Sequence, residues 1–547
     1  MALDFQDPVT LQVLWNRLVF ITDQADIALG RTSFSPIVRE NHDYVTVLMD
    51  TEGNALAQCT LAIPVFISTL PMAVKEHFLK AHPPSTLRPG DILATNNPRI
   101  GTGHPPDLVM VTPVFLEGRI VAYAGCIAHL PDVGGRPQSP DSVDVFEEGI
   151  RLPIVKLFRE GVPNQDVLDI IACSSRLPEE VLGDINAMVA ANEVMRREVL
   201  AFLAEYRLVT LADLARTIYA RSEAHLRKAI RAVPNGIYRA EMLLDGIESD
   251  ITLRAAVHVH DDSIHVDYAG TSAQVENGIN VMPHYRIAHS LYALKCLLDP
   301  ASPNNEGCTL PCTDEAPEGS ILNPRPTAAG AARNLVGHTI PSLIFRALAD
   351  VLPERVQADS GGAPIWGINC TGMDRVGRPY SSIQNFHGGQ GGRCGLDGND
   401  TLSFPSNCKV TPVEIYERSV PVVIERKELV PDSGGAGRFR GGLGQRGVIR
   451  NISGQPMNIY LNTEHVRHPC FGVLGGADGA PGRVTLGNAP VPSKGRVVVQ
   501  HGEALVIETP GGGGWGDPAA RDPGLLAADV AEGLVTRAGA AQDYGHG

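Results

Sequence analysis

The chain has 547 residues, which is too long for a single hydrophobic core, so we expect roughly two to four subdomains. Hydrophobic residues make up 43% of the chain and charged residues 20%, as in ordinary globular proteins. The net charge of -15 argues against a nucleic-acid partner, because binding to phosphates needs basic patches.

The sequence also argues against a membrane or secreted protein. No apolar stretch approaches the length of a membrane span, and the N-terminus M-A-L-D-F-Q-D-P lacks the basic and apolar regions of a secretory signal. We therefore expect a cytoplasmic protein whose ten cysteines are free thiols.

The first part of the chain mixes helical and strand patterns. Apolar residues recur at helical spacing over residues 8–31, and D-T-E-G-N separates two strand-like runs at 43–49 and 55–59. A short helix is predicted at 70–79 and a strand at 92–94. This region therefore combines a long helix with β-hairpins.

The middle of the chain is more helical. We predict helices within 164–205 and 208–231, with Pro178 and two glutamates in the first turn of one of them. Strands are predicted within 237–270, followed by helices at 284–298 and 332–351.

Glycine clusters dominate the sequence after about residue 355. Runs that alternate like strands lie between them at 410–416 and 420–424, and the tail at 522–538 is predicted to be a helix. The clusters favour tight β-turns, although exposed backbone amides can also bind phosphate. No G-x-x-x-x-G-K-[ST] motif accompanies them. The clusters are G-G-Q-G-G at 388–392, S-G-G-A-G-R-F-R-G-G-L-G at 433–444 and T-P-G-G-G-G-W-G-D-P at 509–518.

These patterns predict an α+β fold with several subdomains. The expected regions are a mixed α/β region that carries the candidate metal site at 1–160, a helical region at 161–235, a mixed α/β region at 236–354, and a glycine-rich β region with a C-terminal helix at 355–547.

One predicted hairpin carries the same polar motif at both ends. His-x-x-Asp occurs as His104 and Asp107 before the first apolar run, and again as His129 and Asp132 after the second. A turn signal, L-E-G-R at 116–119, separates the two runs. One such motif is uninformative, but two copies at matched ends of one hairpin call for an explanation.

Hairpin geometry brings the two motifs together. If the turn is centred between Glu117 and Gly118, the numbers of paired residues sum to about 235, so Asp107 lies opposite Ala128 and beside His129. Neighbours across an antiparallel ladder are about 5 Å apart. Two imidazoles and two carboxylates would then meet at the open end of the hairpin.

Such a set of nitrogen and oxygen donors is typical of a site for Zn²⁺, Mn²⁺ or Fe²⁺ and unsuited to Ca²⁺. Asp43, which opens an earlier predicted strand, is a candidate for a further ligand. The alternative is that two polar loops simply cap a hairpin.

Other reactive side chains have simpler interpretations. Cys308 is a candidate nucleophile, but a buried thiol is the favoured interpretation. His284 and His289 flank an apolar helix and are predicted to be core or interface residues.

Several segments together resemble the hydantoinase B / 5-oxoprolinase family, to which the large subunits of acetone and acetophenone carboxylases are related. The similarity runs through almost the whole chain with the motifs in consistent order. The matching segments are N-N-P-R-I-G-T-G-H-P-P-D, I-A-H-L-P-D-V-G-G, V-E-N-G-I-N-V, N-E-G-C, T-P-V-E, P-D-S-G-G-A-G-R-F-R-G-G and T-P-G-G-G-G-W-G-D-P.

The resemblance implies a metal centre and a partner chain. The implied ligands are Asp43, His104, Asp107, His129 and Asp132, with Asp43, His129 and Asp132 as catalytic candidates. Whether Asp43 or Asp107 binds the metal or acts as a base stays open. A hydantoinase A-type subunit is expected to bind ATP with Mg²⁺ in an A₂B₂ complex and to phosphorylate the substrate there.

The resemblance favours the ATP-dependent opening of a cyclic amide such as a hydantoin, 5-oxoproline or a lactam. The alternatives are a subunit of a ketone carboxylase, which would consume bicarbonate, and a non-catalytic scaffold. The sequence departs from the family's usual N-D-P at Asn96-Asn97-Pro98 and from its second histidine at Leu130. These departures spare the implied ligands.

Overall fold

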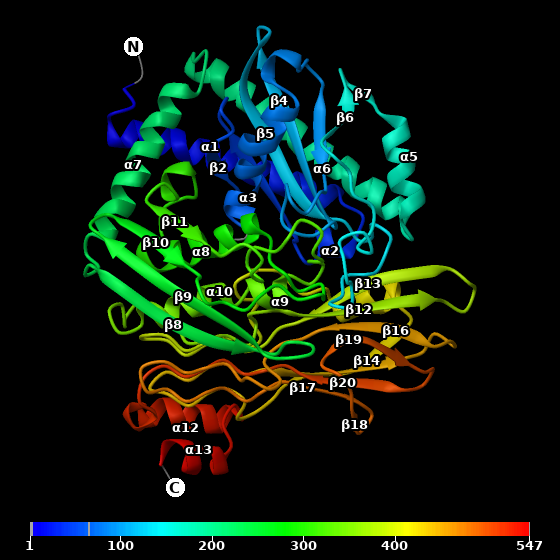
Figure 1. Cartoon of the computed structure of the whole chain (residues 1–547), viewed down its shortest axis with the longest axis vertical. Helices are drawn as coiled ribbons and strands as arrows, with labels where there is room; N and C mark the ends of the chain where they lie inside the picture. Colours follow the sequence, from blue (N-terminus) through cyan, green and yellow to red (C-terminus); the bar gives the residue numbers. More distant parts are fainter. Residues whose placement is uncertain (1–3, 64–65, 546–547) are drawn as a thin grey trace.

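The computed structural model describes residues 4–63 and 66–545. Figure 1 shows an N-terminal sheet with its helices at the top, a second sheet in the middle and a β-rich region at the bottom, where the last two helices lie. The predicted α+β class is confirmed, because helices and mainly antiparallel sheets build all of these parts.

The N-terminal sheet has seven strands in the order β2-β1-β5-β4-β3-β6-β7, and all of their pairings are antiparallel. The long β4–β5 hairpin, which was predicted from the sequence, occupies its centre. The strands are β1 (Tyr44–Met49), β2 (Ala55–Gln58), β3 (Ile92–Thr95), β4 (Asp107–Leu116), β5 (Arg119–His129), β6 (Val155–Arg159) and β7 (Val162–Pro163).

Both faces of this sheet are buried, because helices cover each of them. Helices α1 and α6 pack on one face, against Leu48 and Leu108, while α3 packs on the other, against residues such as Val47 and Val109. The central strands are therefore apolar at nearly every position. The helices of this part are α1 (Pro8–Thr32), α2 (Pro36–Arg39), α3 (Phe66–Ala73), α4 (Leu79–Ala81), α5 (Gln165–Ser174), α6 (Pro178–Tyr206) and α7 (Ala212–Ile230).

The second sheet has the order β11-β10-β9-β8, and α8 and α10 pack against it. Residues of β8 and β9 alternate between buried and more exposed positions, as expected when the other face meets solvent. Its elements are β8 (Gly236–Leu244), β9 (Ile251–His260), β10 (Ser263–Asp267), β11 (Cys312–Glu315), α8 (Pro283–Leu298), α9 (Asn334–Gly337) and α10 (Ile340–Leu348).

The C-terminal β region contains two sheets that share one core. Trp366 and Ile459 of one sheet and Ile449 and Ile507 of the other belong to a single buried cluster. The strands are β12 (Trp366–Met373), β13 (Pro379–Phe386), β16 (Met457–Asn462) and β19 (Lys494–Val499) in one sheet, and β14 (Val422–Leu429), β15 (Gln445–Asn451), β17 (Arg483–Leu486), β18 (Ala489–Pro490) and β20 (Ala504–Glu508) in the other.

Two predictions for this region were wrong. The run 410–416, predicted as a strand, leads into helix α11 (Val413–Ser419). Pro412 lies at the start of this helix, where its fixed φ and missing N–H are tolerated. Glu414 in the first turn also favours a helix, because an acidic side chain interacts well with the N-terminal end of the helix dipole. The predicted single C-terminal helix is two helices, α12 (Pro523–Glu532) and α13 (Arg537–Tyr544). Gly533 ends the first of them with φ of 75°, a left-handed conformation.

The glycine clusters form a layer of extended segments and are not a set of tight turns. Their backbones lie so close that a Cβ atom on Gly389, Gly442 or Gly512 would overlap backbone atoms of a neighbouring segment. The amides of these residues donate to carbonyls of adjacent segments, for example Gly512 N–H to Gly442 O at 3.0 Å and Gly442 N–H to Gln390 O at 2.7 Å. These amides are therefore used within the fold, which removes them as phosphate donors.

The largest hydrophobic cluster crosses the predicted regional boundaries. It contains Val45 and Tyr123 from the first predicted region, Val257 and Leu343 from the third, and Phe404 from the fourth. The division at residues 160, 235 and 354 stays a prediction, but the interior that surrounds the candidate site is continuous across it.

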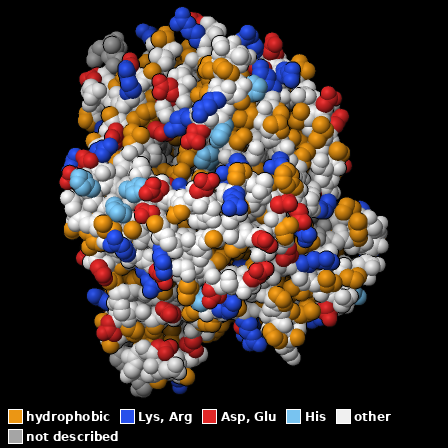
Figure 2. All heavy atoms as spheres, viewed as in Figure 1, with side chains coloured by type: hydrophobic (Ala, Val, Ile, Leu, Met, Phe, Trp, Pro, Cys, Tyr) orange, Lys and Arg blue, Asp and Glu red, His pale blue; other side chains and the backbone are white. Residues whose placement is uncertain are grey.

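The surface is mixed in charge. On the face visible in Figure 2, acidic and basic side chains are interspersed with apolar ones. Among the described residues, no helix combines the length and the apolar character that crossing a bilayer requires.

The glycine layer gives a direct stability test. Gly389→Ala should lower the free energy of unfolding by about 3 kcal/mol or more, because the new methyl group meets the backbone of Gly442, which cannot yield. The matched control is Gly118→Ala at the β4–β5 turn, where φ is 77° and the methyl group meets open space. That variant should lose only about 1–2 kcal/mol from backbone strain. Equal losses in urea unfolding would contradict this account of the layer.

Candidate metal centre

The ends of three neighbouring strands meet at the predicted site. Asp43 immediately precedes β1, Asp107 begins β4 and His129 ends β5, which lies between the other two. The backbone N–H of His129 donates to the carbonyl of Asp43 at 3.0 Å, and Asp107 is the direct cross-strand partner of His129. The sheet itself therefore brings these three residues side by side.

A β-bulge corrects the predicted register of the hairpin by one residue. Near the turn, Phe115 pairs with Ile120, as the predicted sum of 235 requires. The bulge beside Phe115 then shifts the pairing, so that Asp107 lies opposite His129 and not opposite Ala128. The extra residue of a bulge has this effect on every pair beyond it.

His104 reaches the site from the loop between β3 and β4. Its Nδ1–H donates to the carbonyl of Ala331 at 3.1 Å, so the neutral ring presents a lone pair at Nε2. That atom lies 3.0 Å from Oδ2 of Asp107. Burial, assisted by the charge of Arg333, lowers the pKa of His104 to about 4. A neutral imidazole is the form that binds metals.

The geometry fits a cation. Ligand atoms of His104, Asp107 and His129 lie within 4.8 Å of one another, and all three residues are buried. His104 Nε2, Asp107 Oδ1 and His129 Nδ1 are buried without a hydrogen-bond partner. A metal ion would satisfy these atoms, and two nitrogens with a carboxylate suit Zn²⁺, Mn²⁺ or Fe²⁺. A cavity of about 60 Å³, which Asp43 also lines, offers room for an ion and water.

Arg333 balances the charge of Asp107. Its guanidinium donates to Asp107 Oδ2 at 2.9 Å, also contacts Thr102, and lies 4.1 Å from the ring centre of Tyr285. Burial alone would raise the pKa of Asp107, but the charge of Arg333 favours the ionised carboxylate and holds this pKa well below its usual range. Asp107 is therefore ionised, with Oδ2 on the arginine and Oδ1 left unpaired.

Asp43 has a different electrostatic environment. Burial raises the pKa of Asp43 to about 6, and the charge of Asp107 adds to the rise, while His129 opposes it. Arg333 and His42 also oppose the rise, but among the described residues no salt bridge forms at Asp43, so its carboxylate can serve as a further ligand of a divalent ion.

The structure does not bring Asp132 into this group. The chain leaves the ladder after His129, where the N–H of Leu130 donates to the carbonyl of Pro106 at 2.8 Å. Asp132 then accepts hydrogen bonds from Ser175 Oγ at 3.1 Å and from the N–H of Arg176 at 2.5 Å, and it forms an ion pair with the Arg176 guanidinium. Its carboxylate therefore ties the loop to the start of α6.

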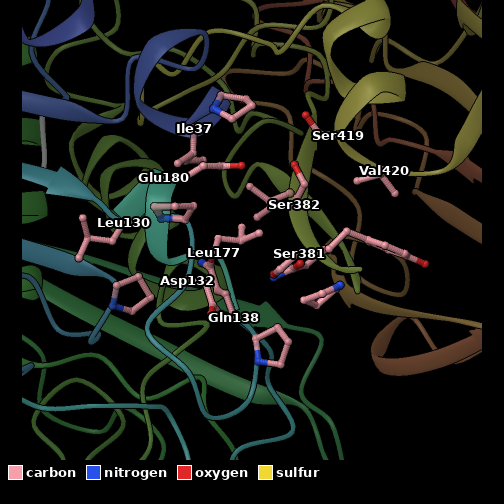
Figure 3. Close-up of a pocket in the computed structure, with 18 of the residues that line it drawn as sticks. Ile37, Leu130, Asp132, Gln138, Leu177, Glu180, Ser381, Ser382, Ser419 and Val420 are labelled. Carbon is pink, nitrogen blue, oxygen red and sulfur yellow. The ribbon is translucent and has the colours of Figure 1, made fainter. Parts of the chain in front are cut away.

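A larger cavity of about 470 Å³ lies beside the small one (Figure 3). His129, Gln138, Ile37 and Ile383 line both, so the candidate metal centre opens toward the larger space. Side chains from the N-terminal part and from β13 and α11 of the C-terminal β region form its walls. A small organic molecule could reach the metal centre through it.

Sequence reasoning missed the far wall of the site. This wall comes from segments more than 150 residues away, which were predicted as helices at 284–298 and 332–351 and as part of the glycine-rich β region. The run A-A-G-A-A-R at 328–333 was a local hint of a close backbone approach. The residues that it contributes are Tyr285, Arg333, Asn334, His338 and Cys408. The other predictions for reactive residues are resolved: Cys308 is a buried thiol, and all ten cysteines are free.

A second buried group, Asp359, His465 and Cys470, has the composition of a metal site but different hydrogen bonding. Both ring nitrogens of His465 lie 2.9 Å from carbonyl oxygens, those of His468 and Ala363. Since carbonyls only accept, both nitrogens must carry protons, and no lone pair is left for a metal. Burial opposes this charge, but Cys470 and Asp359 outweigh it and raise the pKa of His465 well above its ordinary value.

Comparisons with known proteins show the family to which this chain belongs. A sequence profile described as hydantoinase B/oxoprolinase matches residues 7–518. The chain therefore belongs to the hydantoinase B/oxoprolinase family, as the sequence motifs predicted.

Two relatives match over nearly their whole length. The B subunit of a putative D-/L-hydantoinase from Pseudomonas sp. (strain NS671) is 28% identical, with 98% of this chain and 95% of the relative covered. The beta subunit of the caprolactamase from Pseudomonas jessenii is also 28% identical, with 98% and 96% covered. By contrast, 5-oxoprolinase 1 of Arabidopsis thaliana is 28% identical over 94% of this chain but only 42% of its own length.

Solved structures agree on the fold. The crystal structure of the ATP-dependent caprolactamase from Pseudomonas jessenii superposes with a TM-score of 0.88 at 28% identity, over 98% of this chain and 96% of that one. Nucleotide-free acetone carboxylase gives the same TM-score at 19% identity, over 98% and 79%. The second likeness shows a shared fold.

The charge of His465 makes stability depend on pH. His465→Gln should lower the free energy of unfolding by about 1–3 kcal/mol near pH 6, because buried carbonyls lose a donor. The folded-state pKa is raised, so the stabilisation is full below the unfolded pKa of about 6.5 and is lost as pH rises through the folded value. The deficit in urea unfolding should therefore shrink at alkaline pH, while His260→Gln at an exposed position should be neutral throughout. A deficit that grows with pH would contradict the charged form.

Metal content distinguishes the candidate ligands. Asp107→Asn and Asp43→Asn should each reduce the metal retained after dialysis, measured by inductively coupled plasma mass spectrometry, because each removes a negative oxygen ligand. Asp132→Asn is the matched control: it should retain metal but lose about 1–3 kcal/mol of stability, because the buried contact with Arg176 is weakened. Loss of metal in the Asp132 variant alone would overturn this assignment.

Proposed function

We propose that this chain is the metal-bearing B-type subunit of an ATP-dependent amidohydrolase that opens a cyclic amide such as a hydantoin, 5-oxoproline or a lactam. The observation that carries the proposal is the buried group of His104, Asp107 and His129, whose ligand atoms lie within 4.8 Å of one another beside a cavity of organic-ligand size. Relatives named as parts of a hydantoinase and of a caprolactamase support it.

The proposed ligands are His104, Asp107 and His129, with Asp43 as the fourth. A bound divalent ion such as Zn²⁺ or Mn²⁺, or alternatively Fe²⁺, supplies Lewis acidity and lowers the pKa of water. In this arrangement Ala331 fixes the tautomer of His104, and Arg333 keeps Asp107 ionised.

The remaining chemistry is assigned to the partner. An amide carbonyl is a poor electrophile because resonance stabilises it, and phosphorylation of its oxygen creates a leaving group. This chain has no phosphate-loop motif, and its glycine layer uses its own amides, so we assign ATP with Mg²⁺ to an A-type subunit in a cytoplasmic A₂B₂ complex. The hydantoinase and caprolactamase relatives are each named as one subunit of an enzyme, which supports a partner chain.

Within this chain the substrate would approach through the larger cavity. His129 lies at the junction of the two cavities and thus faces both the ion and the incoming molecule. Asp132 supports the loop that follows His129 through Arg176 and acts as a positioning residue. The alternative, a ketone carboxylase subunit, is less favoured, because the chain covers less of acetone carboxylase and with lower identity.

The test is a coupled assay of the chain purified with its A-type partner. ATP consumption and ring opening should depend on a hydantoin, 5-oxoproline or a lactam and should not require bicarbonate. Since loss of an outer partner of a metal ligand already costs about 10- to 100-fold, His129→Ala should reduce turnover by at least about 100-fold. His260→Ala, at an exposed position, should leave turnover unchanged. Activity that requires a ketone and bicarbonate would move the chain to the carboxylases, and full activity of the His129 variant would reject metal catalysis.

A further inference from the structure

A second group of metal-type ligands lies outside the proposed active site. Ligand atoms of Glu76, His77 and His284 lie within 4.8 Å of one another. Glu76 and His77 belong to a π-helical turn, Val74–Phe78, that continues α3, and His284 is the second residue of α8. Single π-helical turns are rare and frequently occur at functional sites.

The tautomer of His284 creates an electrostatic conflict. Its Nδ1–H donates to the carbonyl of Ile100 at 3.1 Å, because a carbonyl can only accept. The neutral ring then has a lone pair at Nε2, and this atom lies 3.3 Å from Oε2 of Glu76. Two electron-rich atoms at this distance require a proton or a metal ion to bridge them.

His77 favours the metal ion over the proton. The ring centres of His77 and His284 are 5.8 Å apart, so a second imidazole lies close to His284 Nε2 and Glu76 Oε2. Among the described residues, the His77 ring takes part in no hydrogen bond, so it has a lone pair available for an ion.

We infer that Glu76, His77 and His284 form a second binding site for a divalent transition-metal ion of the Zn²⁺ class. Two imidazoles and one carboxylate suit Zn²⁺, Co²⁺ or Ni²⁺ and disfavour Ca²⁺ and Mg²⁺. Because Glu76 is 51% exposed, water would complete the coordination, as in sites with three protein ligands.

The second site is connected to the first through one loop. Ile100, which fixes the His284 ring, lies in the loop between β3 and β4 that also carries Thr102 and His104. An ion at the second site would link the π-helical turn to α8 and, through the contact of His284 with Ile100, to this loop. It would therefore stabilise the loop without taking part in the chemistry.

The experiment measures binding in an Asp43→Asn background, which weakens the first site without breaking the buried Arg333–Asp107 ion pair. The full-length chain is titrated with Zn²⁺ in equilibrium dialysis, and bound Co²⁺ is followed in parallel by its visible absorption. One equivalent should bind to the background protein. His77→Gln added to it should weaken this binding by at least about tenfold, the minimum seen when even an outer partner is removed. The matched control is His82→Gln, at a nearby histidine outside the group.

Each outcome decides the question. Loss of one equivalent and of the Co²⁺ band with His77→Gln, but not with His82→Gln, supports the site. Unchanged affinity and spectrum with His77→Gln would overturn it. His284→Gln is a second test. Because His284 is buried, circular dichroism is used to check that this variant folds. If it does not fold, the result with the half-buried His77 decides the question. The comparison of variants within one background reports only the second site, so it stands even if the proposed function is wrong.

Discussion

The pairing of β5 between β1 and β4 is the constraint on which the candidate site depends. Because both pairings are antiparallel, the start of β1, the start of β4 and the end of β5 fall at one edge of the sheet. The bulge beside Phe115 then sets the register that places Asp107 against His129. A shift of one residue would turn every side chain of the shifted strand to the opposite face and would separate these groups.

The rest of the fold completes and closes this edge. Glu148, a buried carboxylate, accepts hydrogen bonds from the N–H groups of Gly330 and Ala331 at 2.7 Å each. The carbonyl of Ala331 in turn accepts the Nδ1–H of His104, so hydrogen bonds from Glu148 through Ala331 fix the orientation of the His104 ring. Partners of this kind fix the tautomer and the ring orientation of metal-binding histidines. The C-terminal β region adds the outer wall of the larger cavity, and its glycine layer lets backbones approach where side chains would not fit.

Local sequence patterns predicted the near half of the site. The two His-x-x-Asp motifs and the turn between them were enough to expect the β4–β5 hairpin, because hairpin pairing follows from the turn position. The bulge was not predictable, since nothing at Phe115 differs from an ordinary strand residue. The far wall with Arg333 was also missed, because contacts across more than 200 residues leave no periodic signal. Similarly, Asp132 repeats the motif of Asp107, but the chain has left the ladder there, so equal motifs do not have equal geometry.

The ion pair between Arg333 and Asp107 links the site to the stability of the fold. Both side chains are almost completely buried, and the arginine occupies Oδ2 while Oδ1 stays unpaired. This division explains how a carboxylate can be held ionised in the interior and still have an oxygen free for a cation. It also means that removing Asp107 would leave the Arg333 charge buried without a partner, which is strongly destabilising in general. Arg333, from a distant segment, thus needs the charge of Asp107 to be stable in the interior. Asp107 in turn needs Arg333 to stay ionised. The candidate site is therefore part of the core that joins the N-terminal sheet to the segment with Arg333. Loss of Asp107 would disturb this packing as well as remove a candidate metal ligand.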